Sequence, residues 1–544
     1  MTRPPRARAA TYGTRGSRVA AGIAIAIPCA FIAVFFAYPV ASILGRGLAP
    51  NGALDLDPLR RVFTDPTQRG VVWFTVWQAA LSTVLTLVLA LPGAYVLARL
   101  RFPGRSLVRA LVTIPFVMPT VLVASAFLAL GVPRSLGAIL LAHVFFNYAV
   151  VVRVVGELWR HLDPQEEDAA RMLGASRLRV FREITLPALR PGIVAAATIT
   201  FLFCFTSFGV ILFLGGPTRS TIETEIYRQT TRFLDLPLAA ALSIVQLAAV
   251  IALLWLVGRF QRGASVPRRL RAAREVEHRP RSIADRVLLV TNLTVMATLL
   301  ALPLGELVVR SLTPPSGPGF GYYRALGTVR AGSTLFVAPL DAVGNSLRFA
   351  VVATVIAVTV GGLAAWAGVR TRSRWLEGAL ALPLGISAVT LGFGFLIALD
   401  EPPLDLRGSQ WLVPLAQALV AMPFVVLLTA PVLRAIDPRM RDAATMLGAS
   451  PARVRRAVDL PIAARALFVA AAFAFAISLG EFGATTFVAR PDTPTIPIVV
   501  YRLLGQPGDV SFGAAMAASC ILMLLVALAV LAGDRVRAGR LGEF

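Results

Sequence analysis

Two stretches of this chain, DAARMLGASRLRVFREITLP at residues 168–187 and DAATMLGASPARVRRAVDLP at residues 442–461, are near copies of one another. They form the centre of a longer repeat, because residues 163–228 align without gaps to residues 437–502, always 274 positions apart. A repeat of this kind indicates two structural halves built on one plan. The fold of one half therefore determines the fold of the whole chain.

The composition places both halves in a lipid bilayer. Hydrophobic residues make up 57% of the 544 residues, charged residues only 15%, and the mean hydropathy is +0.73, which is far more apolar than a soluble domain. Runs long enough to cross a hydrocarbon core of about 30 Å recur near residues 19–44, 71–98, 108–131, 136–157, 192–214, 237–258, 287–309, 347–369, 376–399, 411–433, 466–489 and 512–533. The sequence thus predicts an all-α polytopic membrane protein of about 12 transmembrane helices.

The basic residues set the orientation of these spans. All 53 are arginine, and the net charge is +24, but the arginines cluster between apolar runs, which favours a membrane protein over a nucleic-acid-binding one. The positive-inside rule places both termini in the cytoplasm. Six spans separate the two copies of the repeat, so the halves are parallel and related by an axis along the membrane normal.

The boundaries of the halves follow from the same pattern. We predict a first half at residues 1–258 with a cytoplasmic loop at 161–190, and a second half at 287–544 with a loop at 435–465. The arginine-rich segment 259–286 between them is predicted to be a cytoplasmic linker, either solvated or lying on anionic headgroups.

The chemistry of the repeated loop predicts two short helices. Asp163 can cap the first helix, Gly174 can end it, and Ser176 can start the second. Asp437 and Gly448 stand at the matching positions of the second copy. Two loops of the same chemistry on one side of the membrane suit a partner that is itself two-fold symmetric.

The doubled stretch resembles the EAA loop in permease subunits of bacterial ABC importers that depend on a binding protein. In that family Glu-Ala-Ala is followed by Gly and then by Ile-x-Leu-Pro. Here Asp168 and Asp442 replace the glutamate and Val458 replaces the isoleucine, while the spacing is intact in both copies. The resemblance covers nearly the whole chain from the second apolar run onward. It implies a type I importer permease of the inner membrane, with two six-helix halves fused in one polypeptide.

In that family the loop is a coupling helix that inserts into a groove on an ATPase subunit. The resemblance therefore implies two ABC ATPase subunits on the cytoplasmic side and an extracytoplasmic solute-binding protein on the other. A chain without lysine has no Walker A loop, so a separate subunit would bind ATP, and we expect neither enzyme activity nor a cofactor in this chain. Transferred by position, the coupling residues are Asp168, Ala169, Ala170, Gly174, Leu186, Pro187, Asp442, Ala443, Ala444, Gly448, Leu460 and Pro461.

The fifth span of each half supplies a candidate translocation pathway. The repeat places Ser207 opposite Glu481, each followed by a phenylalanine, Phe208 and Phe482. Because a charge facing lipid is costly, Glu481 is predicted to face the interior of the bundle. Two interpretations of Glu481 stay open: it serves packing alone, or it lowers the barrier for a cationic solute.

Fused permeases of this size are known chiefly from thiamine and ferric-iron importers. Residues 205–247 are most similar to the thiamine type, and residues 478–502 are similar to both. The resemblance implies import of thiamine or its phosphates, with ferric iron as the alternative. A proton- or sodium-coupled secondary transporter is the rival from another class, and its acidic relay would depend chiefly on Glu481.

A membrane enzyme is the third hypothesis, but no clustered acids, bases or metal ligands favour it. The cysteines lie inside apolar runs and the histidines are far apart, with no disulfide or zinc spacing. We predict that the cysteines are core residues and the histidines surface residues: Cys29, Cys204 and Cys520, and His143, His161 and His278.

Overall fold

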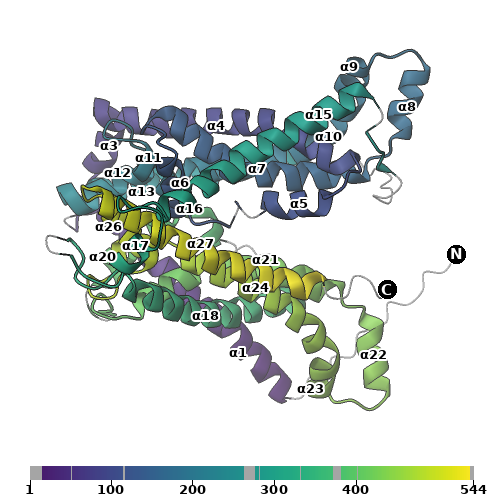
Figure 1. The fold of residues 1–544 in the computed structure, drawn as a ribbon. Helices are drawn as coiled ribbons and strands as arrows, with labels where there is room; N and C mark the ends of the chain where they lie inside the picture. The colour runs from purple at the N-terminus through teal and green to yellow at the C-terminus, as the bar shows by residue number, and fades with distance from the viewer. Residues whose placement is uncertain are drawn as a thin grey trace.

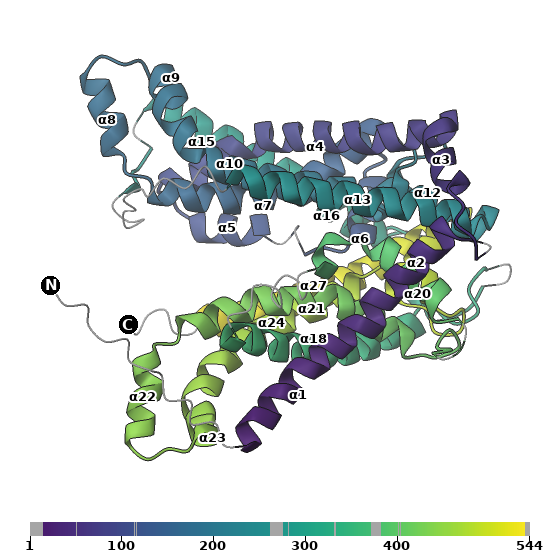
Figure 2. The same cartoon turned by 180° about the vertical axis from the view of Figure 1, so that it is seen from behind.

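The fold is all-helical, as predicted, in the part of the chain that the computed structural model describes. That part comprises residues 15–50, 52–113, 115, 117–261, 276–280, 282–330, 333–371, 382–400, 402 and 404–538. Within it, ten helices are long and apolar enough to cross a membrane. They lie in two layers, one above the other in Figure 1 and seen from behind in Figure 2.

The helices up to residue 261 belong to the first half of the sequence. They are α1 (Arg15–Ile32), η1 (Ala33–Ala37), α2 (Tyr38–Leu48), α3 (Asp57–Thr64), α4 (Pro66–Arg99), α5 (Arg105–Thr113), α6 (Thr120–Ala129), α7 (Leu136–His161), α8 (Gln165–Met172), α9 (Arg177–Val180), η3 (Phe181–Thr185), α10 (Leu186–Phe205), α11 (Gly209–Leu214), α12 (Ile222–Arg228), η4 (Gln229–Phe233) and α13 (Leu236–Gln261).

The helices from residue 283 onward belong to the second half. They are α15 (Ile283–Met296), η5 (Ala297–Ala301), α16 (Leu302–Ser311), α17 (Gly321–Ala325), α18 (Asp341–Thr371), η6 (Leu382–Gly385), α20 (Ala388–Ala398), α21 (Leu412–Ala435), α22 (Pro438–Met446), α23 (Pro451–Val454), η7 (Arg455–Asp459), α24 (Leu460–Gly480), α25 (Thr485–Val488), α26 (Ile496–Leu504) and α27 (Asp509–Ala538).

Two of the predicted spans, 108–131 and 376–399, are not continuous helices. In the first, Pro115 and Pro119 lie between α5 and α6; a proline has no backbone N–H to donate, so the helix is broken there. In the second, Ser387 caps α20 by accepting a hydrogen bond from Thr390 N at 3.1 Å. The apolar helices that remain, α6 and α20, have 10 and 11 residues. At 1.5 Å per residue each reaches about half-way across a bilayer core.

The first span of each half crosses to the other half. The first span of the chain, α1 to α2, packs against α18 and α20 of the second half, and α15 and α16 pack against α4 and α6 of the first. Figures 1 and 2 show α1 in the layer of α18 and α15 in the layer of α4. The sequence boundary between residues 258 and 287 is therefore not a boundary between two separately packed bodies.

Small residues let the central helices approach closely. At Gly361 on α18, an added Cβ would lie 2.9 Å from the Cβ of Val425 and 3.0 Å from the carbonyl oxygen of Met422 on α21. Only glycine fits this contact without displacing α21. In a bilayer, where burial of apolar surface gives helices little reason to associate, such close packing is a main source of stability.

Most of the predicted linker 259–286 lies outside the described residues, but its end at residues 276–280 is docked on the first half. The backbone N–H of His278 donates to the carbonyl of Arg99 at 2.9 Å, and the carbonyl of His278 accepts from Arg101 N at 2.8 Å. This end of the linker is therefore attached to the last turn of α4.

An ion-pair cluster holds the same segment. The Glu277 carboxylate lies 2.7 Å from Arg105 Nη1, and Arg160 of α7 lies 3.9 Å away. Burial raises the pKa of Glu277, but the hydrogen bond from Arg105 and the charges around it outweigh this effect, so its pKa lies below the ordinary value. The docked segment thus neutralises arginines at the ends of two membrane spans.

Candidate functional site

The repeated loops fold into the pair of short helices that the sequence predicts. The first helices are α8 and α22; the Asp163 carboxylate accepts from Gln165 N at 3.0 Å, and the Asp437 carboxylate accepts from Arg439 N at 2.9 Å. Each helix is followed by a left-handed glycine, Gly174 with φ of 84° and Gly448 with φ of 78°. A left-handed turn favours glycine, which has no Cβ. The predicted breaks are therefore confirmed.

The second short helices join the loops to the membrane spans. Ser176 caps α9 by accepting from Arg179 N at 3.3 Å, and Ser450 accepts from Arg453 N at 3.4 Å at the start of α23. A π-helical turn follows in each half, η3 or η7, and Leu186-Pro187 or Leu460-Pro461 then begins α10 or α24. Proline suits the first turn of a helix because its missing N–H is not needed there.

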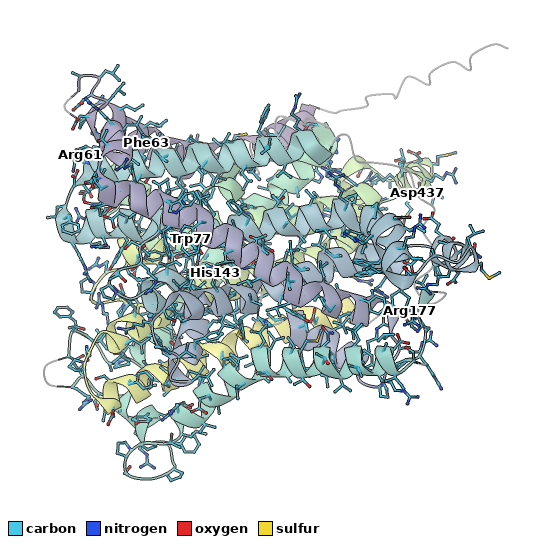
Figure 3. All side chains as sticks on the ribbon, turned by 90° about the horizontal axis from the view of Figure 1, so that it is seen from above. Arg61, Phe63, Trp77, His143, Arg177 and Asp437 are labelled. Atoms are coloured by element: carbon cyan, nitrogen blue, oxygen red, sulfur yellow. The ribbon has the colours of Figure 1, made fainter. Side chains whose placement is uncertain are left out.

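The predicted coupling residues lie on the outer surface of the loops. Asp168 and Ala169 are exposed and Ala170 is half-buried, and the same holds for their counterparts Asp442, Ala443 and Ala444. Gly174, Gly448, Leu186, Pro187, Leu460 and Pro461 are exposed as well. Figure 1 shows both pairs of short helices protruding at one end of the molecule, and Figure 3 shows Arg177 and Asp437 toward one end with Arg61 at the other.

Sequence reasoning missed the most exposed apolar side chains of these loops. Met172 and Leu173 are each 89% exposed, and their counterparts Met446 and Leu447 are 89% and 88% exposed. Exposed apolar groups at identical places of two loops indicate a contact surface for another protein. The signal was present, since MLGAS is the longest identical run within the two quoted stretches.

Each short helix is also fastened to the π-helical turn that leads into its span. In the first half, Thr185 Oγ1 donates to the Glu167 carboxylate at 2.8 Å. In the second half, Arg441 Nε lies 2.7 Å from Asp459 Oδ1. These pairs occupy the same two positions of the repeat, so a force on either short helix is passed to α10 or α24 through one polar contact.

A central cavity of about 320 Å³ lies between the two halves, and all four candidate pathway residues line it. Its walls come from α7 and α10 on one side and α21 and α24 on the other. Ser207 and Phe208 lie where α10 ends and α11 has not yet begun, and Glu481 and Phe482 lie at the matching break between α24 and α25. The predicted fifth spans are thus interrupted at the cavity.

The Glu481 side chain is buried, at 6% exposed, and is fully hydrogen-bonded. Its carboxylate accepts from Ala484 N at 2.7 Å, from Thr485 N at 2.8 Å and from the Thr485 hydroxyl. A carboxylate at the first turn of a helix satisfies backbone N–H groups that have no partner within the helix. Glu481 therefore caps α25, and its role in transport stays a prediction.

A chain of polar side chains reaches Ser207 from the first half. His143 Nε2 lies 2.9 Å from Ser207 Oγ, and His143 Nδ1 lies 2.9 Å from Ser82 Oγ. The prediction that the histidines are surface residues is wrong for His143, which is buried on the inner face of α7. The prediction that the cysteines are core residues is wrong for Cys29, which is exposed. A buried histidine needs such partners for both ring nitrogens.

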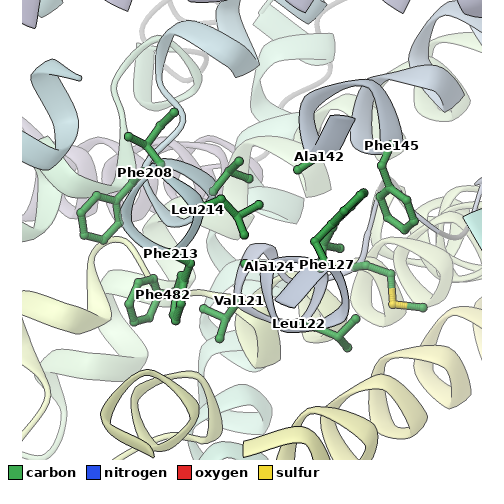
Figure 4. Close-up of a cluster of buried hydrophobic side chains, with 14 of the residues drawn as sticks. Val121, Leu122, Ala124, Phe127, Ala142, Phe145, Phe208, Phe213, Leu214 and Phe482 are labelled. Atoms are coloured by element: carbon green, nitrogen blue, oxygen red, sulfur yellow. The ribbon is translucent and has the colours of Figure 1, made fainter. Parts of the chain in front are cut away.

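Aromatic rings from the two halves close one end of the central cavity. Phe208 stacks on Phe482 with ring centroids 5.5 Å apart, Phe213 contacts Tyr501 at 5.5 Å, and Tyr227 contacts Phe487 at 5.7 Å. Figure 4 shows Phe208, Phe213 and Phe482 side by side. We call these six rings the aromatic seam. They are three pairs of residues 274 positions apart, so the seam is symmetric about the axis that relates the halves.

A buried carboxyl group joins the halves close to the seam. Glu223 of α12 is fully buried; Ser387 Oγ of the second half donates to it at 2.8 Å, and Gln246 donates to its other oxygen. Sequence reasoning missed Glu223 because it has no acidic counterpart in the second half, where Pro497 stands at that position.

Comparison with known proteins finds a family match for part of the chain and relatives that are similar over most of it. Residues 90–269 match the family described as "Binding-protein-dependent transport system inner membrane component". The chain is 29% identical over 465 residues to the thiamine transport system permease protein ThiP of Escherichia coli K12, covering 80% of this chain and 83% of that protein. It is 29% identical over 510 residues to ThiP of Brucella abortus strain 2308, covering 87% and 89%.

A further relative matches over almost the full length. The chain is 25% identical over 577 aligned positions to the probable ABC transporter permease protein y4fN of Sinorhizobium fredii NGR234, covering 97% of this chain and 99% of that protein. The family match includes the first repeated loop, and the relatives extend the similarity across both halves. This chain is therefore similar, over both halves, to inner-membrane permeases of binding-protein-dependent ABC importers, and its ten apolar helices fit a multi-pass membrane protein.

Proposed function

We propose that this chain is the permease of an ATP-driven importer for thiamine or its phosphates, with both termini in the cytoplasm. The observation that carries the ATP-driven part is the pair of loops with identical exposed Met-Leu tips, held at one end of the molecule. One ATPase subunit would dock on each loop. ATP would be bound by those subunits and not by this chain.

The loops are built to transmit a movement of the ATPase subunits. Closure of two docked subunits would push α8 and α22 toward each other. The polar contacts Thr185–Glu167 and Arg441–Asp459 would carry that movement to α10 and α24, which line the central cavity. Each partner shifts the equilibrium between inward and outward states only to the extent that it binds one state more tightly.

The other end of the molecule suits a solute-binding protein. There the aromatic seam and the Glu223–Ser387 hydrogen bond hold the halves together. A binding protein docked at this end would deliver solute when the seam opens. In the outward state the seam would be open and the cytoplasmic end of the cavity, near the coupling loops, would be closed. In the inward state the reverse would hold.

The solute follows from the relatives and from the walls of the cavity. Two of the three relatives described above are named thiamine transport permeases. Thiamine is a flat heteroaromatic cation, and aromatic faces such as Phe208 and Phe482 attract such cations. The Glu481 carboxylate at the same cavity favours positive charge, which leaves ferric iron as the alternative solute.

Uptake into proteoliposomes tests this proposal. The chain would be reconstituted with its ATPase subunits and binding protein, and the uptake of radiolabelled thiamine and of ferric citrate would be compared. We expect thiamine uptake that requires both ATP and the binding protein. Uptake of iron alone would refute the thiamine assignment. Uptake driven by a proton or sodium gradient without ATP would refute the ATP-driven part and favour a secondary transporter.

A further inference from the structure

A second cavity, of about 230 Å³, lies in the second half near the coupling loop α22–α23. It is bounded by α18, α21 and the start of α24, and we call it the lateral groove. Apolar side chains and one glycine form its walls: Gly362, Trp366, Leu433, Leu460, Ala463 and Leu467.

The lateral groove faces away from the central cavity. Phe424 of α21 lines the central cavity and Leu433 of the same helix lines the groove. Nine residues separate them, about two and a half turns, so their side chains point to opposite sides of α21. A membrane span that faces the pathway on one side faces neighbouring helices or lipid on the other. The groove is therefore not part of the solute pathway.

The mouth of the groove is positively charged. Arg455 and Arg456 line it at the start of η7, where the chain returns from the cytoplasmic loop. Neither has an ion-pair partner in the described part of the chain. Among the described residues that line the groove, the one acid is Asp459, which is paired with Arg441 at 2.7 Å. Two guanidinium groups without a carboxylate partner among the described residues thus stand at the cytoplasmic mouth of an apolar slot.

A polar group inside the groove is left without a partner. Thr429 lines the groove and is only 1% exposed, and its hydroxyl makes no hydrogen bond to any residue that the structure describes. A threonine in a helix ordinarily donates to the carbonyl four residues earlier, and an unsatisfied buried hydroxyl is costly. The Thr429 hydroxyl is itself inaccessible from the groove, so the apolar side chains and the two arginines define the occupant.

The first half carries larger side chains at several positions that correspond to the lining of the groove. Trp159 stands 274 positions before Leu433 and packs edge-to-face on Tyr95, with ring centroids 5.3 Å apart. Phe181 stands at the position of Arg455. The smaller Leu433 and the added arginine are therefore specific to the second half.

We propose that the lateral groove binds an anionic glycerophospholipid from the cytoplasmic leaflet. One acyl chain lies along Trp366, Leu433 and Leu467, and the phosphate contacts Arg455 and Arg456. Basic pockets between membrane helices on the cytoplasmic side bind such headgroups. The bound lipid would support η7, the turn that joins the coupling loop to α24.

Native mass spectrometry of the assembled importer tests this proposal. The complex would be reconstituted in nanodiscs of phosphatidylcholine and phosphatidylglycerol in equal parts, extracted, and the retained lipids counted. We expect the unchanged complex to keep one phosphatidylglycerol that Arg455→Gln/Arg456→Gln loses, because each arginine contributes about fivefold in affinity. Leu433→Trp, which copies the first half, should lose the same lipid by filling the groove.

The matched control is Arg182→Gln, at the first-half position that corresponds to Arg456. This variant should keep the lipid. The proposal is overturned if phosphatidylcholine is retained as well as phosphatidylglycerol, if the double arginine variant retains the lipid, or if Arg182→Gln loses it equally. Should Leu433→Trp fail to assemble, the double arginine variant decides alone, since its changes lie at the mouth of the groove.

Discussion

Replacing Leu173 or Leu447 with serine tests whether the loop tips dock on the ATPase subunits. Both side chains are almost fully exposed, at 89% and 88%, so each has nearly all of its apolar surface available for burial by a partner. Full burial of a leucine side chain is worth about 1.5–3 kcal/mol. Taking about 2 kcal/mol, each substitution should weaken docking on its loop about 30-fold.

The assay is binding of purified ATPase subunit to the permease held in nanodiscs, followed by transport and ATPase activity of the assembled complex. The double variant Leu173→Ser/Leu447→Ser should bind more weakly than either single variant, because the two loops serve separate subunits. Neither single substitution should affect folding, since exposed side chains contribute little to it.

The control is Phe336→Ser in the loop between α17 and α18, at the opposite end of the molecule. Phe336 is 75% exposed, so its substitution removes a comparable apolar surface. ATPase affinity that stays within about threefold of the unchanged protein in Leu173→Ser and in Leu447→Ser would refute the assignment of the tips, because the expected loss is ten times larger.

Four further outcomes are expected. Native mass of the purified importer should show one copy of this chain with two ATPase subunits, and two copies of the chain would contradict the fused-halves assignment. Gly174→Asp or Gly448→Asp should leave the chain in the membrane but abolish transport and stimulated ATPase activity, because an L-residue is strained at a φ near +80°; survival of both activities would count against it. Glu481→Gln should strongly reduce uptake while assembly and basal ATPase activity persist, and loss of the assembled complex would leave only its capping role. Docking of the linker end should depend on acid: the pKa of Glu277 is below its ordinary 4.5, so docking is fully stabilised above pH 4.5 and weakens as the pH falls through the lowered value. Hydrogen exchange at residues 276–280 measures this, and a matching change in Glu277→Gln would show that another group is responsible.

The sequence predicted those features of the fold that follow directly from a residue type, such as a helix break at a glycine or a membrane span from a long apolar run. Apolar length located ten long helices, and the left-handed glycines and capping residues located the breaks in the loops. Hydropathy carries no information on which neighbour a span packs against, so the crossing of α1 to the second half and of α15 to the first could not be predicted. The half-length helix α6 was missed because the apolar run continues through Pro115 and Pro119.

In the candidate site, too, the positions of the residues could be predicted but their hydrogen bonds could not. The repeat brought Ser207, Phe208, Glu481 and Phe482 to one cavity because symmetric positions of parallel halves meet at their common axis. The hydrogen bonds of Glu481 to α25 depend on the backbone path after Gly480, which a pattern of residue types does not specify. The hydrogen-bond partners of a buried polar group therefore could not be predicted from the sequence pattern.

Fusion of the two halves has a consequence at the aromatic seam. Phe208 and Phe482 are the same position of the repeat, and they stack face to face across the axis. In an importer built from two copies of a single half-length chain, every change beside that axis would occur twice, and a carboxylate at one position would confront an identical carboxylate. A single gene for both halves lets one copy acquire an acid while the other keeps a hydroxyl, as Glu481 and Ser207 do. An uneven pair of polar side chains at the central cavity is thus available to a covalently joined pair of halves and not to a homodimer.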